Sequence, residues 1–171
     1  MSKPERTEPE VSRPGMPPEY GILDPAEGKG LLPWSWARER LSNSRNYWLS
    51  TTRPGGGPHV VPVWGTWLDE QFYFSTLARS QKVRNLAADP RCVICPEGAH
   101  EAVIVEGIAM EVSDPAASRR FEEAYEQKYQ EEIDTSQGGL YAVQPRVAFA
   151  FISTAEDFPG SATRWRFPRG V

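Results

Sequence analysis

The sequence predicts a mainly β protein, a small antiparallel β-barrel with peripheral helices. Short segments in which apolar and polar residues alternate are separated by turns rich in glycine and proline, a pattern typical of antiparallel strands joined by hairpins. Helical periodicity occurs in two or three segments only, and their order does not fit a doubly wound parallel sheet. No internal repeat is visible in the 171 residues.

Seven strands are expected, and the second of them contains Pro62, which indicates a sheet edge or a bulge. The fifth strand is apolar on both faces in its middle, as expected for a barrel wall that also packs against another subunit. The expected strands cover residues 47–52, 59–66, 72–76, 92–95, 101–112, 146–153 and 162–167, and the expected helices cover 36–41, 80–88 and 115–133.

The first 33 residues form a separate segment by composition. They contain seven of the 16 prolines and almost no apolar periodicity, so they cannot bury enough surface to offset the entropy of ordering. We expect residues 1–33 to be an irregular, proline-rich arm, either mobile or laid across a partner subunit. Residues 34–171 are expected to form one folded domain.

Composition excludes several functional classes. A net charge of -4 without a basic cluster argues against nucleic-acid binding. No apolar run approaches the ~18 residues of a membrane span, and Met1 to Glu10 lack a signal-peptide core. Two cysteines cannot form a disulfide scaffold, so we expect a cytoplasmic protein without a membrane partner.

The segment from Ser75 to Leu86 predicts an anion-binding site. A strand ends at Ser75 and Thr76, and a helix begins at Ser80, with Arg79 before it and Lys82 in its first turn. The first turn of a helix presents unpaired N–H groups and the positive end of the helix dipole. Two cations at that end are unfavourable for the helix alone and are explained if an anion binds there.

Other motifs give little support for catalysis by side chains or for a metal site. Cys92 and Cys95 lie three residues apart on an expected strand, so their sulfurs should point to opposite faces. His59 and His100 have neither zinc-finger spacing nor a triad context. We therefore expect no catalytic side chain and no metal, and if the protein is an enzyme, a cofactor carries the reaction. The strand Ala162 to Phe167 alternates arginine with aromatic residues, as either an ordinary barrel strand or a wall for a flat anionic ligand.

Several strings, in this order and spacing, resemble the flavin and deazaflavin oxidoreductases built on the split β-barrel of pyridoxamine 5′-phosphate oxidase. The resemblance runs from about Trp36 to Phe167 and implies a six- to seven-stranded antiparallel split barrel. The matching strings are Tyr47 to Thr52, Pro58 to Trp64, Phe72 to Thr76, Ser80-x-Lys82-x-x-Asn85-Leu86, Asp89-Pro90-Arg91, Val105-Glu106-Gly107 and Thr163 to Phe167.

The resemblance also implies a homodimer with two equivalent cofactor sites at the subunit interface. When the family's site is carried over by position, residues around the helix start would bind the cofactor phosphate and the second strand would line the cofactor ring. The last strand would approach the cofactor from the same subunit or from the other one. These residues are, in that order, Ser75, Thr76, Arg79, Ser80, Gln81, Lys82 and Asn85; His59, Val60, Pro62, Val63 and Trp64; and Trp165 and Arg166.

The cofactor implied by the closest resemblance is the deazaflavin coenzyme F420. The chain has His59 and Trp64 where the FMN-dependent oxidase pattern has basic residues, and pyridoxal-phosphate contacts are not evident. Lys82 matches the lysine of a K-x-x-N-L string that commonly holds the F420 phosphate. The sequence thus indicates hydride transfer between F420 and a small-molecule substrate. An FMN-dependent oxidoreductase and a non-catalytic flavin- or haem-binding carrier or sensor are the alternatives.

Overall fold

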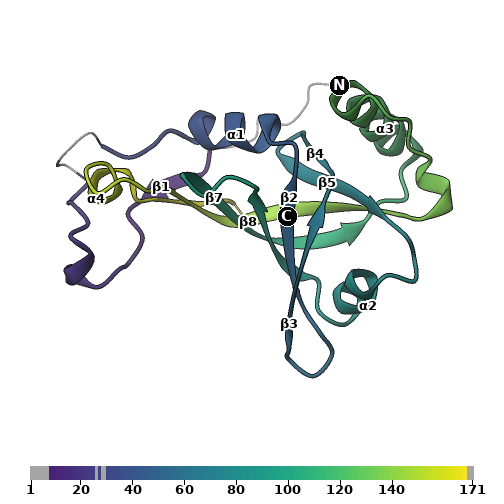
Figure 1. The fold of residues 1–171 in the computed structure, drawn as a ribbon, viewed down its shortest axis with the longest axis horizontal. Helices are drawn as coiled ribbons and strands as arrows, with labels where there is room; N and C mark the ends of the chain where they lie inside the picture. The colour runs from purple at the N-terminus through teal and green to yellow at the C-terminus, as the bar shows by residue number, and fades with distance from the viewer. Residues whose placement is uncertain (1–7, 26, 28–29, 169–171) are drawn as a thin grey trace.

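The computed structural model describes residues 8–25, 27 and 30–168 of the chain. The described chain is built on an antiparallel sheet that curves around one main core, with the helices at its periphery (Figure 1). The expectations for residues 1–7, 26, 28–29 and 169–171 lie outside the described residues. The expected mainly β, antiparallel split-barrel fold is confirmed.

The described chain contains nine strands, four α-helices and two 3-10 turns. The strands are β1 (Glu10–Ser12), β2 (Tyr47–Thr52), β3 (Pro58–Val63), β4 (Thr66–Leu68), β5 (Gln71–Thr76), β6 (Arg91–Pro96), β7 (Glu101–Glu111), β8 (Gly139–Ile152) and β9 (Thr163–Arg166). The helices are α1 (Trp34–Asn43), α2 (Gln81–Ala88), α3 (Pro115–Tyr129) and α4 (Phe158–Ser161), and the 3-10 turns are Pro18–Tyr20 and Thr135–Gln137.

The strands follow the order β1-β9-β8-β7-β6-β2-β3, all antiparallel, and β5 joins β8 as well as β4. The β2–β3 hairpin closes in the expected glycine-rich loop, with Thr52 opposite Pro58 and Thr51 opposite His59. This pairing makes β3, which contains Pro62, an edge strand of the described sheet, as the proline indicated.

Three differences from the expected bounds, two in strands and one in a helix, have a clear structural origin. The second expected strand is broken after Val63, and its last residue belongs to β4. Strand β8 begins at Gly139, earlier than expected, because Leu140 to Val143 are buried consecutively and show no alternation. Helix α3 ends at Tyr129 instead of near Ile133, since Gln130 adopts a left-handed conformation with φ of 59° and caps the helix.

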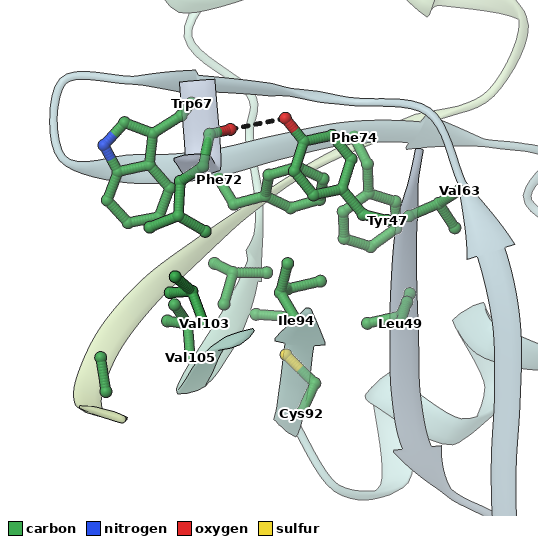
Figure 2. Close-up of a cluster of buried hydrophobic side chains, with 14 of the residues drawn as sticks. Tyr47, Leu49, Val63, Trp67, Phe72, Phe74, Cys92, Ile94, Val103 and Val105 are labelled. Atoms are coloured by element: carbon green, nitrogen blue, oxygen red, sulfur yellow. Dashed lines mark hydrogen bonds between the residues drawn. The ribbon is translucent and has the colours of Figure 1, made fainter. Parts of the chain in front are cut away.

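The main core lies between the curved sheet and α1. Side chains from β2, β5, β6 and β7 point toward one another in it, and the hydroxyl of Tyr47 donates to the Leu41 carbonyl of α1 at 2.5 Å (Figure 2). Trp34 and Trp165 meet edge-to-face there, with ring centroids 5.3 Å apart. A smaller apolar cluster joins α3 to the sheet through Phe121, Tyr125 and Tyr129, and neighbouring side chains of β5 and β8 complete it.

The opposite face of the sheet, which we call the outer face, is turned away from the main core, and α4 packs on it at the end of β8, where Phe158 stacks on Phe151. Side chains directly opposite one another on neighbouring strands define it: Trp48 and Ser50 (β2), Val60 and Pro62 (β3), Val93 and Cys95 (β6), Ile104, Glu106 and Ile108 (β7), and Val147 and Phe149 (β8). Most of these side chains are apolar and half-buried, and Trp48 and Val60 are 46% and 53% exposed.

The described part of the N-terminal segment lies along its own domain. Strand β1 pairs with β9, so that Val11 lies opposite Trp165. Nη1 of Arg13 donates to the carbonyl oxygens of Gly160 and Ala162, each at 2.8 Å. The segment is otherwise mostly irregular, as expected, and these contacts attach it to β9 and α4. Within the described residues, no helix is long and apolar enough to cross a membrane.

Candidate functional site

The helix start that was expected to bind an anion is formed by α2. Ser80 caps the helix, and its Oγ accepts hydrogen bonds from the Val83 N–H at 3.4 Å and from the Thr76 hydroxyl at 3.2 Å. Residues 77–80 connect the end of β5 to α2, and α2 lies beside the β2–β3 hairpin (Figure 1). The remaining N–H groups of the first turn are available to a ligand.

A polar relay connects α2 to the β2–β3 hairpin. Nε2 of Gln81 donates to Oδ1 of Asn85 at 2.7 Å, and Nδ2 of Asn85 donates to Oγ1 of Thr51 at 2.9 Å. Oγ1 of Thr51 lies 3.3 Å from Nδ1 of His59. Asn85 is completely buried, and its position is fixed by both bonds. The relay therefore holds His59 next to the start of α2.

The site is electropositive. Partial burial, followed by the positive charges of Arg53 and Lys82, lowers the pKa of His59 below its ordinary value of 6.5. Partial burial also lowers the pKa of Lys82. Within the described residues, no carboxylate forms an ion pair or a hydrogen bond with Lys82 or Arg53. Cations that are partly desolvated and lack an acidic partner favour binding of an anion, and a phosphate group fits this donor set.

The structure brings seven of the predicted site residues to one end of the barrel. They are His59 on β3, Ser75 and Thr76 at the end of β5, and Arg79, Ser80, Gln81 and Lys82 at the start of α2. Arg79 is exposed, whereas the other six are partly buried. Asn85 lies beneath them and does not reach the surface, so it positions other residues instead of touching a ligand directly.

Four residues of β3 and its end have different environments. Val60 and Pro62 are exposed on the outer face of this edge strand, where a ligand crossing the edge would meet them. Val63 is 7% exposed and belongs to the core, so its predicted role in lining a ring is wrong for its side chain. Trp64 stacks on Tyr129 of α3 at 4.9 Å and donates to Asn46, which holds it at the end of the hairpin opposite to His59.

The last strand does not reach this site within one chain. Trp165 is 1% exposed and packs in the core against Trp34, so its ring does not reach the surface of this chain. Arg166 is exposed on β9, and four strands separate β9 from β3 in the sheet. The alternation of arginine with other residues correctly predicted that Arg164 and Arg166 share one face of β9. It did not show that the other face, which carries Trp165, is the one turned to the core.

Sequence reasoning missed Thr51 and Arg53. Thr51 shares its face of β2 with Tyr47 and Leu49, and a hydroxyl on an otherwise apolar face was a usable signal. Arg53 carried no signal, because its proximity to His59 and Lys82 depends on how the hairpin packs against α2.

Two hollows on the surface have different linings. One of about 560 Å³ lies on the outer face beside the β2–β3 hairpin, between Thr52, Arg91, Glu106, Ile108 and Arg146. Another of about 510 Å³ on α3 is lined by glutamate and glutamine and is unsuited to an anion. No cluster of three or more residues able to bind a metal occurs in the described ranges. Cys92 is buried and Cys95 lies on the outer face, so the two free thiols diverge as expected.

The family profile described as pyridoxamine 5′-phosphate oxidase matches residues 36–162. The chain belongs to this family. The match covers most of the chain, including α2, the β2–β3 hairpin and the relay between them. It agrees with the resemblance on which the split-barrel fold was expected. No curated protein matches the chain in sequence.

Solved structures share the fold of this pyridoxamine 5′-phosphate oxidase family member. A conserved hypothetical protein from Mycobacterium tuberculosis is 23% identical with a TM-score of 0.62, covering 68% of this chain and 82% of its own. An F420 reductase is also 23% identical, with a TM-score of 0.54 and coverage of 65% and 94%. A haem-binding protein from Mycobacterium smegmatis is 21% identical, with a TM-score of 0.58 and coverage of 70% and 53%.

Proposed function

We propose that this protein is an oxidoreductase that transfers hydride between coenzyme F420 and a small organic substrate. The observation that carries the proposal is the cationic start of α2, where the charge of Lys82, together with that of Arg53 in the hairpin loop, acts on the relay-held His59 and neither cation pairs with a carboxylate of the described residues. F420 is favoured over FMN by the K-x-x-N-L string at Lys82 and by the likeness to a structure named as an F420 reductase.

The residues at the helix start would hold the cofactor phosphate. Lys82 supplies a charge, Ser80 and Thr76 orient the first turn, and Arg79 adds an exposed cation. The edge strand β3 offers Val60 and Pro62 as an apolar border for a flat ring. The deazaflavin supplies hydride chemistry when bound, and the protein contributes orientation and exclusion of water, without an acid or base among its side chains.

The outer face supports the proposal of a homodimer with cofactor sites at its interface. Half-buried apolar side chains extend across β2, β3, β6, β7 and β8, and an apolar face of this extent is typical of a subunit interface. The adjacent hollow would then be enclosed by the second subunit and could admit a small-molecule substrate. Arg166, which is exposed on β9, would act toward the partner's site. We place the protein in the cytoplasm, in keeping with its free thiols.

Two other functions are distinguishable by the ligand. FMN as the working cofactor would use the same phosphate site. A haem or flavin carrier without turnover is kept as a candidate because the fold is shared with a structure named as a haem-binding protein.

Titration of the purified protein with F420, FMN and haem tests these functions. We expect tight binding of F420, and reduction of enones or quinones by the reduced form of F420. Tight binding of FMN without binding of F420 would contradict the proposal and favour the FMN enzyme. Binding of haem alone, with no turnover of any test acceptor, would favour the carrier.

A further inference from the structure

The relay between α2 and β3 has a defined direction. Oδ1 of Asn85 accepts from Gln81, so the amide NH₂ of Asn85 is the donor toward Thr51. The Thr51 oxygen accepts this bond and lies 3.3 Å from Nδ1 of His59, so its hydroxyl proton can be donated to that nitrogen. We assign the neutral ring the tautomer that this bond requires, with the proton on Nε2.

The charges around His59 oppose its protonation in the absence of a ligand. The positive charges of Arg53, in the hairpin loop, and of Lys82, on α2, act on the imidazole, whereas β2 contributes the uncharged hydroxyl of Thr51. No carboxylate of the described residues forms a hydrogen bond or an ion pair with the imidazole. Both cations and partial burial act in the same direction and keep the pKa of His59 low.

An anion at the start of α2 would reverse this balance, because it neutralises the neighbouring cations and stabilises an imidazolium ion. We propose that an anionic ligand held by Lys82 and Arg53 draws a proton onto His59, so that the site takes up ligand and proton together. This inference rests on the proposed function, since it requires a phosphate group to bind at this helix start.

The proton balance is simple. One proton from the solvent adds to Nδ1 of His59, while Nε2 keeps its own proton and remains a donor. The Thr51 oxygen changes from donor to acceptor toward His59, which its second lone pair permits while Asn85 occupies the first. The affinity for a phosphate-bearing ligand should therefore fall as the pH rises from the pKa of His59 in the free protein to its higher pKa in the complex.

The sequence makes this proton directly observable by NMR, because the chain contains two histidines, His59 and His100. His100 is exposed in the turn between β6 and β7 and serves as an internal reference. We would titrate both imidazole signals with and without FMN and F420, assigning them with His59→Gln. We expect ligand to raise the pKa of His59 by at least about one unit.

A binding experiment gives an independent readout. Above about pH 7 the phosphate of FMN stays largely dianionic, so its own titration contributes little. Between about pH 7 and pH 8 the affinity of the wild type should fall up to about tenfold, and that of His59→Gln should stay nearly constant. An unshifted His59 signal in a bound complex, or an equal pH slope in both proteins, overturns the inference and leaves the proposed function intact. Failure of both F420 and FMN to bind overturns both.

Discussion

The buried amide of Asn85 donates to the hydroxyl of Thr51 at 2.9 Å, and this bond joins the helix of the phosphate site to the strand that carries its imidazole neighbour. Asn85 has no solvent exposure, and Thr51 is 6% exposed. Water therefore cannot replace either partner when the bond is broken.

Replacing Asn85 by alanine should cost both stability and ligand binding. Asn85→Ala leaves Thr51 without its donor inside the protein, so the free energy of unfolding should fall by about 1–3 kcal/mol. Urea denaturation measures this loss. Gln81→Ala is the matched control, because Gln81 lies at the partly exposed end of the relay and should change stability less. Equal losses for the two variants would mean that burial of Asn85 is unimportant.

Two cations of α2 offer a direct test of the phosphate site. Lys82→Met should weaken the binding of F420 or FMN at least about tenfold, corresponding to the ~1.5 kcal/mol of a charged hydrogen bond. Arg84→Met should change it little, because Arg84 is exposed and bonded to Gln81. Thermal unfolding should show that Lys82→Met is at least as stable as the wild type, since a partly buried cation is removed. Equal affinity of both variants would remove Lys82 from the site.

Lys128 on α3 should make stability depend on pH. Its amine donates to the Tyr47 hydroxyl at 2.6 Å and to the Gly65 carbonyl at 3.0 Å, and burial lowers its pKa from 10.5 to about 8. Between these two values the unfolded chain binds more protons than the folded one, so the free energy of unfolding should rise with pH. Above about pH 10 the trend should reverse, because burial raises the pKa of Tyr47 in the folded state.

Denaturation at several pH values measures this effect, and Lys128→Met is the control that should lack the rise above about pH 8. A wild-type curve that stays flat or falls from pH 8 to pH 10 would contradict the assignment.

The outer face should control the oligomeric state. Ile104 lies in the middle of β7, half-buried and opposite Phe149. Ile104→Glu places a charge in the proposed interface and should convert a dimer into monomers in sedimentation experiments. Tyr20→Glu alters an aromatic residue of the N-terminal segment that is 55% exposed and is not one of the residues that define this face, and it should leave the dimer unchanged. A wild type that sediments as a monomer would refute the proposed interface.

Local patterns predicted much of the fold. Alternation in Tyr47–Thr52 and Pro58–Val63 and the intervening glycines predicted the hairpin correctly. The first half of β8 was missed because β5, β7 and the α3 cluster surround it. Strands buried on both faces carry no alternation that could reveal them.

The candidate site was predicted less completely. Ser80 and Lys82 were evident because capping and helix-end electrostatics are local. The burial of the Trp165 and Val63 side chains was not predicted, because it is set by the curvature of the sheet around the core, which no short window of sequence contains. The register that places Thr51 opposite His59 is likewise a property of the paired strands.

Strand β1 has a consequence for the solubility of the chain. Its three residues pair with the edge of β9 that β8 does not occupy, and Arg13 donates two further hydrogen bonds to the backbone just before that strand. A chain trimmed to begin at Trp34 would keep the barrel but expose the backbone donors and acceptors of β9. An unprotected strand of this kind recruits other chains and promotes aggregation. By pairing with β9, β1 thus protects the backbone of that strand from pairing with other chains.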